Sequence, residues 1–428
     1  MSSRSPSVNT EVEVATNGTG SGSVNGALAA QSAQLFDLYR ELDQRLQQER
    51  YAEDVIDGAV DRTEDEERYS LSQWQLMWRK FVRNRAALVG GIVIGLFYLT
   101  ALFANFLSPY TLTTRFRDRV YVPPQGIHLF DNGQFAPFAY GVKTGLNIDT
   151  LERVSEIDPT VKYPLRFFVK GEPYMLFGLI PAERHLFGVE GGDGASEGAI
   201  NLLGTDRQGR DMFTRILIGS QVSLTIGLVG VALSLSLGTV LGVVSGFFGG
   251  WIDDVIQRAI ELVRSFPSIP LWMALSAAIP AQWPPMRVYF AVTLILSLIG
   301  WTWLARQLRG QVLTLRSQDF VLAAKLMGAN NGRIIFKHLV PASIGHIIVV
   351  ATLAMPGMIL AETALSFLGL GLQPPVTSWG VLLKEVQNLQ SIAIYPWVFS
   401  PVIFIVVAIL AFNFLGDGLR DAADPYTR

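Results

Sequence analysis

Few residues in this chain have the types and spacing that catalysis would need. The chain contains no cysteine, no phosphate-cradling G-x-x-x-x-G-K-[ST] loop, no G-x-S-x-G elbow and no H-E-x-x-H pair. His338 and His346 flank an apolar run and are interpreted as structural. The one clear carboxylate within such a run is Glu362, about 20 residues beyond Pro341. This position predicts a place near the outer interface and a hydrogen bond to a neighbouring loop. We therefore expect a non-enzymatic chain that holds no cofactor or metal of its own.

The composition of the chain indicates a membrane protein. Of the 428 residues, 50% are hydrophobic and only 16% are charged. The net charge of −2 gives no reason to expect a nucleic-acid partner. Apolar runs long enough to enter the bilayer occupy residues 86–114, 216–252, 265–286, 288–305, 339–370 and 386–416, and Glu362 is the one charged residue within them. They predict an all-α polytopic membrane protein with six transmembrane helices.

Lys and Arg residues set the predicted orientation. Basic residues precede the first run at 79–85, and the segment between the fourth and fifth runs carries six positive charges against one acid, Asp319. Such clusters mark the cytoplasmic side, so both termini are expected inside. Gly238, Gly242 and Gly246 repeat every four residues, which favours close helix packing within this chain.

The remaining segments differ in character. Residues 1–70 are expected to be a disordered, partly helical cytoplasmic extension, with helical spacing at 31–50. Residues 71–114 combine an interfacial helix with the first span. Residues 115–219 are polar and form an expected extracytoplasmic insertion with strand-like pieces, Leu165–Val169 and Tyr174–Leu179. A core of five spans would fill 220–420, and 421–428 would be a cytoplasmic tail.

The loop 306–341 contains a distinctive stretch, Asp319–Pro341. Asp319 can cap a first short helix that ends at Gly328, and Asn330-Asn331-Gly332 predicts a turn. A second short helix would follow and stop at Pro341. The small residues Ala323, Ala324 and Gly328 would allow another surface to approach the backbone closely. The alternative is an ordinary loop between two membrane helices.

The spacing of this stretch resembles the EAA loop of binding-protein-dependent ABC importer permeases, and in particular the "C" subunit of the dipeptide/oligopeptide group. Ala323-Ala324-x-x-x-Gly328 is followed, nine residues on, by His338-Leu339-Val340-Pro341. Three further stretches are similar to that group: 203–215, 359–381 and 411–425. Leu322 stands where the glutamate that names the motif is usual. The resemblance covers the chain from about Trp74 onward, without the outer insertion.

The resemblance implies a type I ABC importer permease fold in the cell inner membrane. It implies a heterodimer with a second homologous permease, two cytoplasmic ATPase subunits that carry ATP-Mg, an extracytoplasmic substrate-binding protein, and surrounding lipid. The residues it implies for ATPase coupling are Ala323, Ala324, Gly328, Arg333, Lys337, His338 and Pro341. Those it implies for family motifs are Gly204, Asp206, Gly209, Arg210, Asp211, Glu362, Gly416, Asp417 and Arg420.

Several functions stay open at this level. Peptides are the leading substrate, with oligosaccharides or nickel as alternatives in the same transporter class. An ion-coupled secondary carrier would need several buried carboxylates, and the sequence offers few. A membrane scaffold acting through residues 1–70 is the remaining alternative.

Overall fold

The computed structural model describes residues 42, 45–46, 73–131, 133–146, 148, 153–189, 198–280 and 282–423. The chain divides into two compact units, Met1–Leu76 and Met77–Arg428. In the first unit, Leu42, Arg45 and Leu46 are helical, and the helix α2 (Gln73–Arg83) begins there. The predictions for residues 1–70 otherwise lie outside the described residues, as does the last part of the predicted tail.

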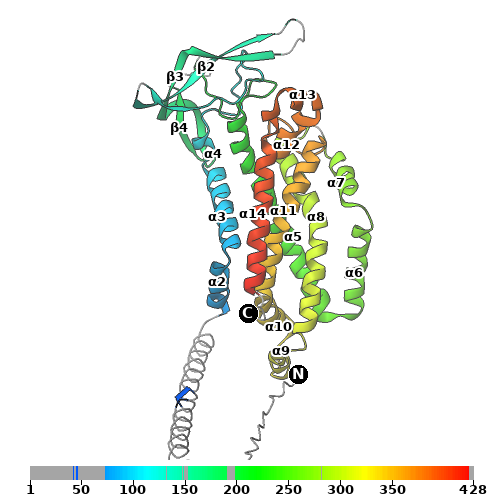
Figure 1. Ribbon diagram of the computed structural model, residues 1–428. Coiled ribbons are helices and arrows are strands. Elements are labelled where there is room, and N and C mark those ends of the chain that lie inside the picture. The colour runs from blue at the N-terminus through cyan, green and yellow to red at the C-terminus, as the bar shows by residue number, and fades with distance from the viewer. Residues whose placement is uncertain are drawn as a thin grey trace, which may run out of the picture. The chain divides into compact units, whose positions relative to one another are not determined.

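Five helices of the described residues are long and apolar enough to cross a membrane, and they form the helical bundle of the second unit (Figure 1). The first is α3 (Arg85–Leu102), whose N-cap Asn84 accepts a hydrogen bond from the backbone of Ala87. The others are α5 (Met212–Phe248), α8 (Pro285–Leu315), α11 (Val340–Phe367) and α14 (Pro401–Ala423).

The expected number of six spans is not confirmed, because the third uncharged run does not form a long helix. After the amphipathic helix α6 (Gly250–Arg264), this run contains only α7 (Ser268–Ala277), which has 10 residues. A helix of that length rises about 15 Å, half of a bilayer core of about 30 Å. Pro267 precedes α7, and Pro280 follows it. These prolines limit the helix at both ends.

The last uncharged run, 386–416, holds a long helix, α14, only from Pro401 onward. The segment before α14 folds as the short helix α12 (Trp379–Lys384), two 3₁₀ turns (Glu385–Gln387 and Pro396–Phe399) and the short helix α13 (Leu389–Ile394). Pro396 and Pro401 each begin a new helical element, because proline cannot donate to a preceding turn. At its other end α14 continues past the predicted limit, Gly416, to Ala423.

The expectation of an all-α chain is wrong for the insertion. Four strands form one antiparallel sheet in the order β1-β2-β3-β4: β1 (His128–Asp131), β2 (Gln134–Leu146), β3 (Arg153–Leu176) and β4 (Ile180–Val189). The first half of β3 pairs with β2, and the second half pairs with β4. The strand-like piece Leu165–Val169 is confirmed within β3. The piece Tyr174–Leu179 is only partly a strand, because β3 ends at Leu176 and a turn follows.

The predicted close packing of the glycine repeat in α5 is confirmed, and its partner is α8. A methyl group added at Gly242 would lie 2.6 Å from the carbonyl oxygen of Ala305, and one at Gly246 would lie 2.8 Å from that of Arg309. At Gly238 it would lie 2.9 Å from Leu304. The two helix backbones therefore approach so closely that only glycine fits between them.

Candidate functional site

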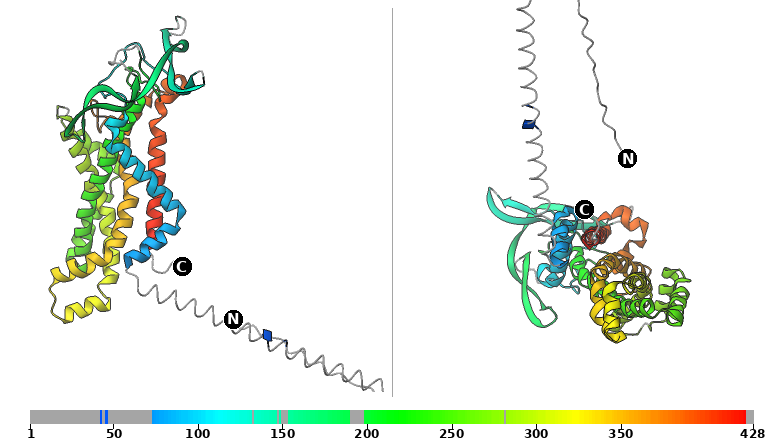
Figure 2. Two further views of the ribbon diagram at one scale, coloured as in Figure 1. Left: turned by 90° about the vertical axis from the view of Figure 1, so that its left-hand side faces the viewer. Right: turned by 90° about the horizontal axis from the view of Figure 1, so that it is seen from below.

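The stretch Asp319–Pro341 lies at the end of the bundle opposite the sheet (Figures 1 and 2). It contains α9 (Asp319–Leu326), α10 (Asn331–Ile334) and a π-helical turn (Ile335–Leu339) that leads into α11. Val321, Ile334 and Leu339 are buried against Val243 of α5 and Val312 of α8. This small apolar cluster fixes the loop to the ends of two membrane helices.

The two predicted short helices are present, but Pro341 does not stop the second. The helical path runs on from Asn331 to Phe367. In the π-helical turn the backbone N–H of Val340 donates to the carbonyl oxygen of Ile335, five residues back. The wider turn accommodates a proline, which lacks an N–H and would clash in a regular α-helix. The second half of the loop, from Asn331 onward, and α11 are therefore one continuous helical element.

The turn between α9 and α10 has a defined geometry. Gly328 has φ +80°, a left-handed conformation that favours glycine, and a methyl group added there would meet no atom within 4 Å. The side chain of Asn330 then caps α10 by accepting a hydrogen bond from the backbone N–H of Arg333 at 2.8 Å. Gln318, rather than Asp319, occupies the N-cap position of α9.

The residues that the resemblance implied for coupling gather on this one loop. Ala323, Gly328, Arg333, Lys337 and Pro341 are exposed, whereas Ala324 and His338 are half-buried. Ala324 packs against the apolar cluster that holds the loop, and the ring of His338 lies 6.5 Å from that of Phe320.

Sequence reasoning missed the apolar residues that the loop exposes. They are large side chains that no element of the described residues covers, and we call them the exposed loop patch: Phe320, Leu322, Leu326, Met327 and Phe336. Leu326 is 90% exposed and Met327 is 86% exposed. The available signal was a Leu-Met pair directly before the turn glycine, at the end of the helix. A contiguous apolar surface of this kind is typical of an interaction site.

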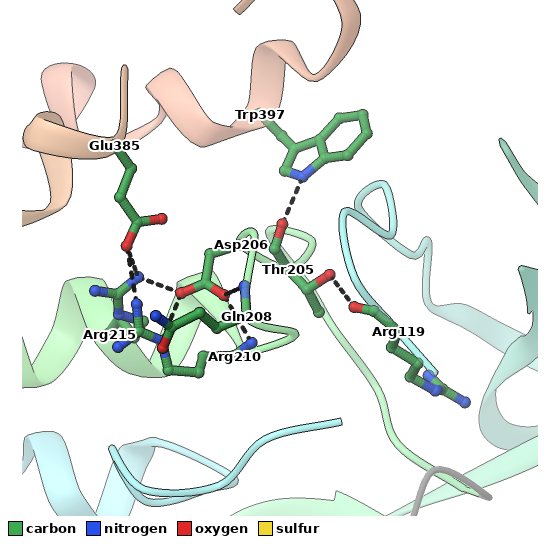
Figure 3. Close-up of polar contacts among 8 residues, drawn as sticks. All are labelled: Arg119, Thr205, Asp206, Gln208, Arg210, Arg215, Glu385 and Trp397. Atoms are coloured by element: carbon green, nitrogen blue, oxygen red, sulfur yellow. Dashed lines mark hydrogen bonds and ion pairs between the residues drawn. The ribbon is translucent and has the colours of Figure 1, made fainter. Parts of the chain in front are cut away.

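A second group of predicted residues meets at the opposite end of the bundle (Figure 3). Asp206 is fully buried, and its carboxylate accepts hydrogen bonds from the backbone N–H groups of Gln208 and Arg210 at 2.7 and 2.9 Å. The side chains of Arg210 and Arg215 also donate to it. Glu385 then accepts from the same two arginines at 2.8 and 3.0 Å. This network links the start of α5 to a segment about 170 residues later.

The motif around Asp206 also holds the chain that follows α3. Trp397 Nε1 donates to the carbonyl oxygen of Thr205 at 3.0 Å, and the Thr205 hydroxyl donates to that of Arg119 at 2.5 Å. Gly209 has φ +71°, and a methyl group added there would lie 2.0 Å from the carbonyl oxygen of Phe116. Gly204 also has a positive φ, +75°. Both positions favour glycine because their backbone is left-handed, and at Gly209 there is also no room for a side chain.

Asp211 has the role of a helix cap. Its carboxylate accepts hydrogen bonds from the backbone N–H of Thr214 at 2.7 Å and from Asn201 Nδ2 at 3.0 Å. Burial raises the pKa of Asp211 from 3.8 to about 6, although these hydrogen bonds act in the opposite direction. Arg215 and Glu385 belong to the same structural unit, and Glu385 was not anticipated from the sequence.

Glu362 is fully buried among hydroxyl groups. Its carboxylate accepts hydrogen bonds from Ser378 at 2.6 Å, Ser366 at 2.8 Å and Ser223 at 3.2 Å. Ser378 precedes α12, so this carboxylate joins α5, α11 and the following loop. The contacts agree with the hydrogen-bonding role expected from the sequence.

The last predicted motif lies on α14. A methyl group added at Gly416 would lie 2.4 Å from the Leu353 side chain, which indicates close packing of α14 on α11. Asp417 and Arg420 are exposed on the same helix. The predicted residues therefore form separate structural sites at the two ends of the bundle, and the loop with its exposed patch is the candidate site for a partner.

Comparisons with known proteins agree with this architecture. Residues 238–428 match the family described as the binding-protein-dependent transport system inner membrane component, and residues 72–124 match the N-terminal TM domain of oligopeptide transport permease C. These matches and the apolar helices define a multi-pass, helical inner-membrane permease. The chain belongs to the family of binding-protein-dependent transport system permeases.

The chain matches individual relatives over most of their length. The chain is 39% identical over 227 residues to the oligopeptide transport system permease protein OppC of Bacillus subtilis (strain 168), covering 53% of this chain and 72% of the relative. It is 31% identical over 363 residues to the dipeptide transport system permease protein DppC of the same organism, covering 84% and 88%. A solved structure of the MetNI methionine ABC transporter in an inward-facing conformation is 17% identical, with a TM-score of 0.40, over 49% of this chain and 97% of that one.

Proposed function

We propose that this chain is the permease subunit of an ATP-driven importer and forms half of a translocation pathway for peptides. The observation that carries the proposal is the exposed loop patch on a rigidly held loop, in a chain without a phosphate-binding loop of its own. Transport against a gradient needs an energy source, and this loop is the surface suited to receive a partner that supplies it.

The partner at the loop is a cytoplasmic ATPase subunit. Leu326 and Met327 would enter an apolar groove on that subunit, while Arg333 and Lys337 would lie at the polar rim. Two such ATPase subunits would bind ATP-Mg and serve two permeases, this chain and a homologous second one. Because the second half of the loop, from Asn331, and α11 form one helical element, movement of the ATPase would reach the membrane along the helix that passes Pro341.

The fold proposed for the assembled core is that of a type I importer permease. In that arrangement α7 would supply the sixth membrane element together with the residues around it, although it is short. The sheet side would face outward and receive a substrate-binding protein, and both termini would be cytoplasmic, as the basic loop requires.

Peptides are the proposed substrates because the relatives named above are an oligopeptide and a dipeptide permease, and a further relative, from Pectobacterium atrosepticum, is a glutathione transport system permease protein. Oligosaccharides and nickel are the alternatives within the same transporter class.

The test is purification of the chain after co-expression with a homologous permease, two ATPase subunits and a binding protein. We expect a stable complex whose ATP hydrolysis rises when the loaded binding protein is added, and vesicles that accumulate labelled peptide. A chain that purifies without any ATPase, or uptake driven by an ion gradient alone, would contradict the proposal. Stimulation by an oligosaccharide or nickel in place of peptides would keep the transporter class and change the substrate.

A further inference from the structure

The hairpin between β3 and β4 has an unusually apolar tip. The ten residues Pro173–Ala182 contain no charged side chain, while Lys170, Glu172, Glu183 and Arg184 flank them. Large apolar side chains at the tip are exposed: Leu179 by 80%, Ile180 by 55% and Met175 by 49%. An exposed apolar cluster of this size in a polar lobe indicates contact with another phase or molecule.

The tip lies beside the end of the first membrane helix. The rings of Phe177 and Phe103 are 5.5 Å apart, and those of Phe168 and Phe106 are 6.2 Å apart. Asn105 Nδ2, on the short helix α4 (Ala104–Leu107), also donates to the carbonyl oxygen of Met175 at 3.4 Å. The hairpin is thus attached to the segment that directly follows α3.

The length of α3 indicates where along the bilayer normal the hairpin contacts the helix end. Its 18 residues rise about 27 Å, close to the bilayer core of about 30 Å, so Phe103 lies where hydrocarbon gives way to headgroups. One face of α3 exposes large apolar side chains along the whole span: Val89, Ile92, Leu96, Leu99 and Leu102. The ring contact of Phe103 with Phe177 places the hairpin tip at the end of this span.

The backbone of the hairpin is also set in an uncommon conformation at the two contact residues. Phe168 and Phe177 both have φ +56°, a left-handed conformation that costs a non-glycine residue some stability. In each case the ring packs against an aromatic residue after α3. The fold therefore keeps these aromatic side chains at the membrane end of the lobe rather than within the sheet.

We propose that the hairpin tip Pro173–Ala182 inserts into the lipid interface next to α3 and anchors the sheet to the membrane surface. Aromatic and aliphatic side chains would enter the boundary between hydrocarbon and headgroups, which aromatic residues favour. The ion pair between Lys170 and Glu183, 2.9 Å long and exposed, would stay at the headgroup level. The proposal depends only on α3 crossing the bilayer, and it is independent of the transported substrate.

The lack of cysteine makes a direct test possible. The Leu179→Cys variant of the full chain, reconstituted in lipid nanodiscs, is labelled with an environment-sensitive fluorophore. Quenching is measured with lipids that carry a nitroxide near the headgroup end of the acyl chain, and with iodide in the water. Leu129→Cys is the matched control, since Leu129 is 52% exposed on β1, which pairs only with β2. Ile180→Cys serves as a second tip position if the first variant assembles poorly.

Severalfold stronger lipid quenching at residue 179 than at residue 129, with protection from iodide, is the expected result. A label at 179 that iodide quenches as well as at 129 would show a tip in water and overturn the proposal. Protection from both quenchers would overturn it too, because the tip would then be covered by protein.

Discussion

Arg309 of α8 holds Asp253 of α6 through two parallel hydrogen bonds, from Nε to Oδ1 at 2.6 Å and from Nη2 to Oδ2 at 2.5 Å. Ser245 of α5 donates to the same carboxylate at 2.5 Å. Three helices are therefore fastened together at one carboxylate near the glycine contacts of α5. Hydrogen bonds from Arg309 lower the pKa of Asp253 below its ordinary value of 3.8.

Asp253→Asn should lower the stability of the bundle by about 1–3 kcal/mol at neutral pH, because it leaves the guanidinium of Arg309 without its carboxylate. Since the folded-state pKa is depressed, the stabilisation is present above pH 3.8 and is lost as the pH falls through the lower folded value. Thermal unfolding in detergent between pH 3 and 7 measures both effects. The neighbouring exposed Asp254→Asn is the control. Equal behaviour of the two variants would contradict the assigned role.

Gly328→Asn should separate ATP hydrolysis from transport. Asparagine tolerates the left-handed backbone at this turn, so the loop is retained while a side chain is added at its surface. We expect transport to fall about tenfold, equivalent to about 1.4 kcal/mol, with the chain still in the membrane. Gly133→Asn, at φ +82° in the turn between β1 and β2, is the matched control. Peptide uptake and ATPase activity in the same vesicles provide the measurement, and normal uptake in the Gly328 variant would refute the coupling role.

Leu326→Asp should weaken binding of the ATPase subunit by tenfold or more, because a charge enters an apolar contact. The side chain is 90% exposed, so the fold of this chain should tolerate the change. Leu129→Asp, at an exposed position of the sheet, provides the comparison. Co-purification yield and a titration of the ATPase subunit would measure the effect. Unchanged affinity would remove Leu326 from the docking surface.

Gly209→Ala should destabilise the junction at the start of α5 by more than about 3 kcal/mol, since it combines a clash with backbone strain. Gly133→Ala has a similar φ but open space around it, so it should cost only about 1–2 kcal/mol from the backbone. The difference between the two unfolding temperatures therefore isolates the contact with Phe116. Equal unfolding temperatures would contradict the prediction, because the backbone near Phe116 would then have moved to admit the methyl group at little cost.

Glu362→Ala should destabilise the chain more than Glu362→Gln. Alanine leaves three buried hydroxyl groups without their acceptor, at about 1–3 kcal/mol for each group that finds no other partner, whereas glutamine keeps one acceptor oxygen. If this carboxylate carried protons across the membrane, both variants would abolish transport equally. We expect the glutamine variant to keep transport, as measured by peptide uptake at several pH values.

The sequence predicted those parts of the fold that depend on local composition. Apolar runs located the five long helices, and the four-residue repeat that begins at Gly238 predicted close helix packing, although not that its partner is α8. The third run misled because prolines 267 and 280 shorten a helix without making the run less apolar. The sheet was expected only as short pieces, since the long pairing of β3 with both neighbours depends on residues distant in the chain.

The candidate sites were predictable to a similar extent. The loop at 319–341 was located from its glycine and turn residues, but its exposed apolar side chains were not, because periodicity does not tell which apolar face lacks a partner. Asp206 and Arg210 were identified from a local motif. Glu385, which binds the same arginines, lies 175 residues from Arg210, and no local signal connects them.

The helix from Asn331 to Phe367 contains 37 residues without a break, about 55 Å at about 1.5 Å per residue. A helix of this length acts as a lever when it moves as a rigid body. A tilt of a few degrees at the loop end displaces the other end by several ångström, and there Glu362 ties it to the outer loop. The π-turn before Pro341 carries the helical path past this proline, and a second proline, Pro356, lies further along inside the same helix.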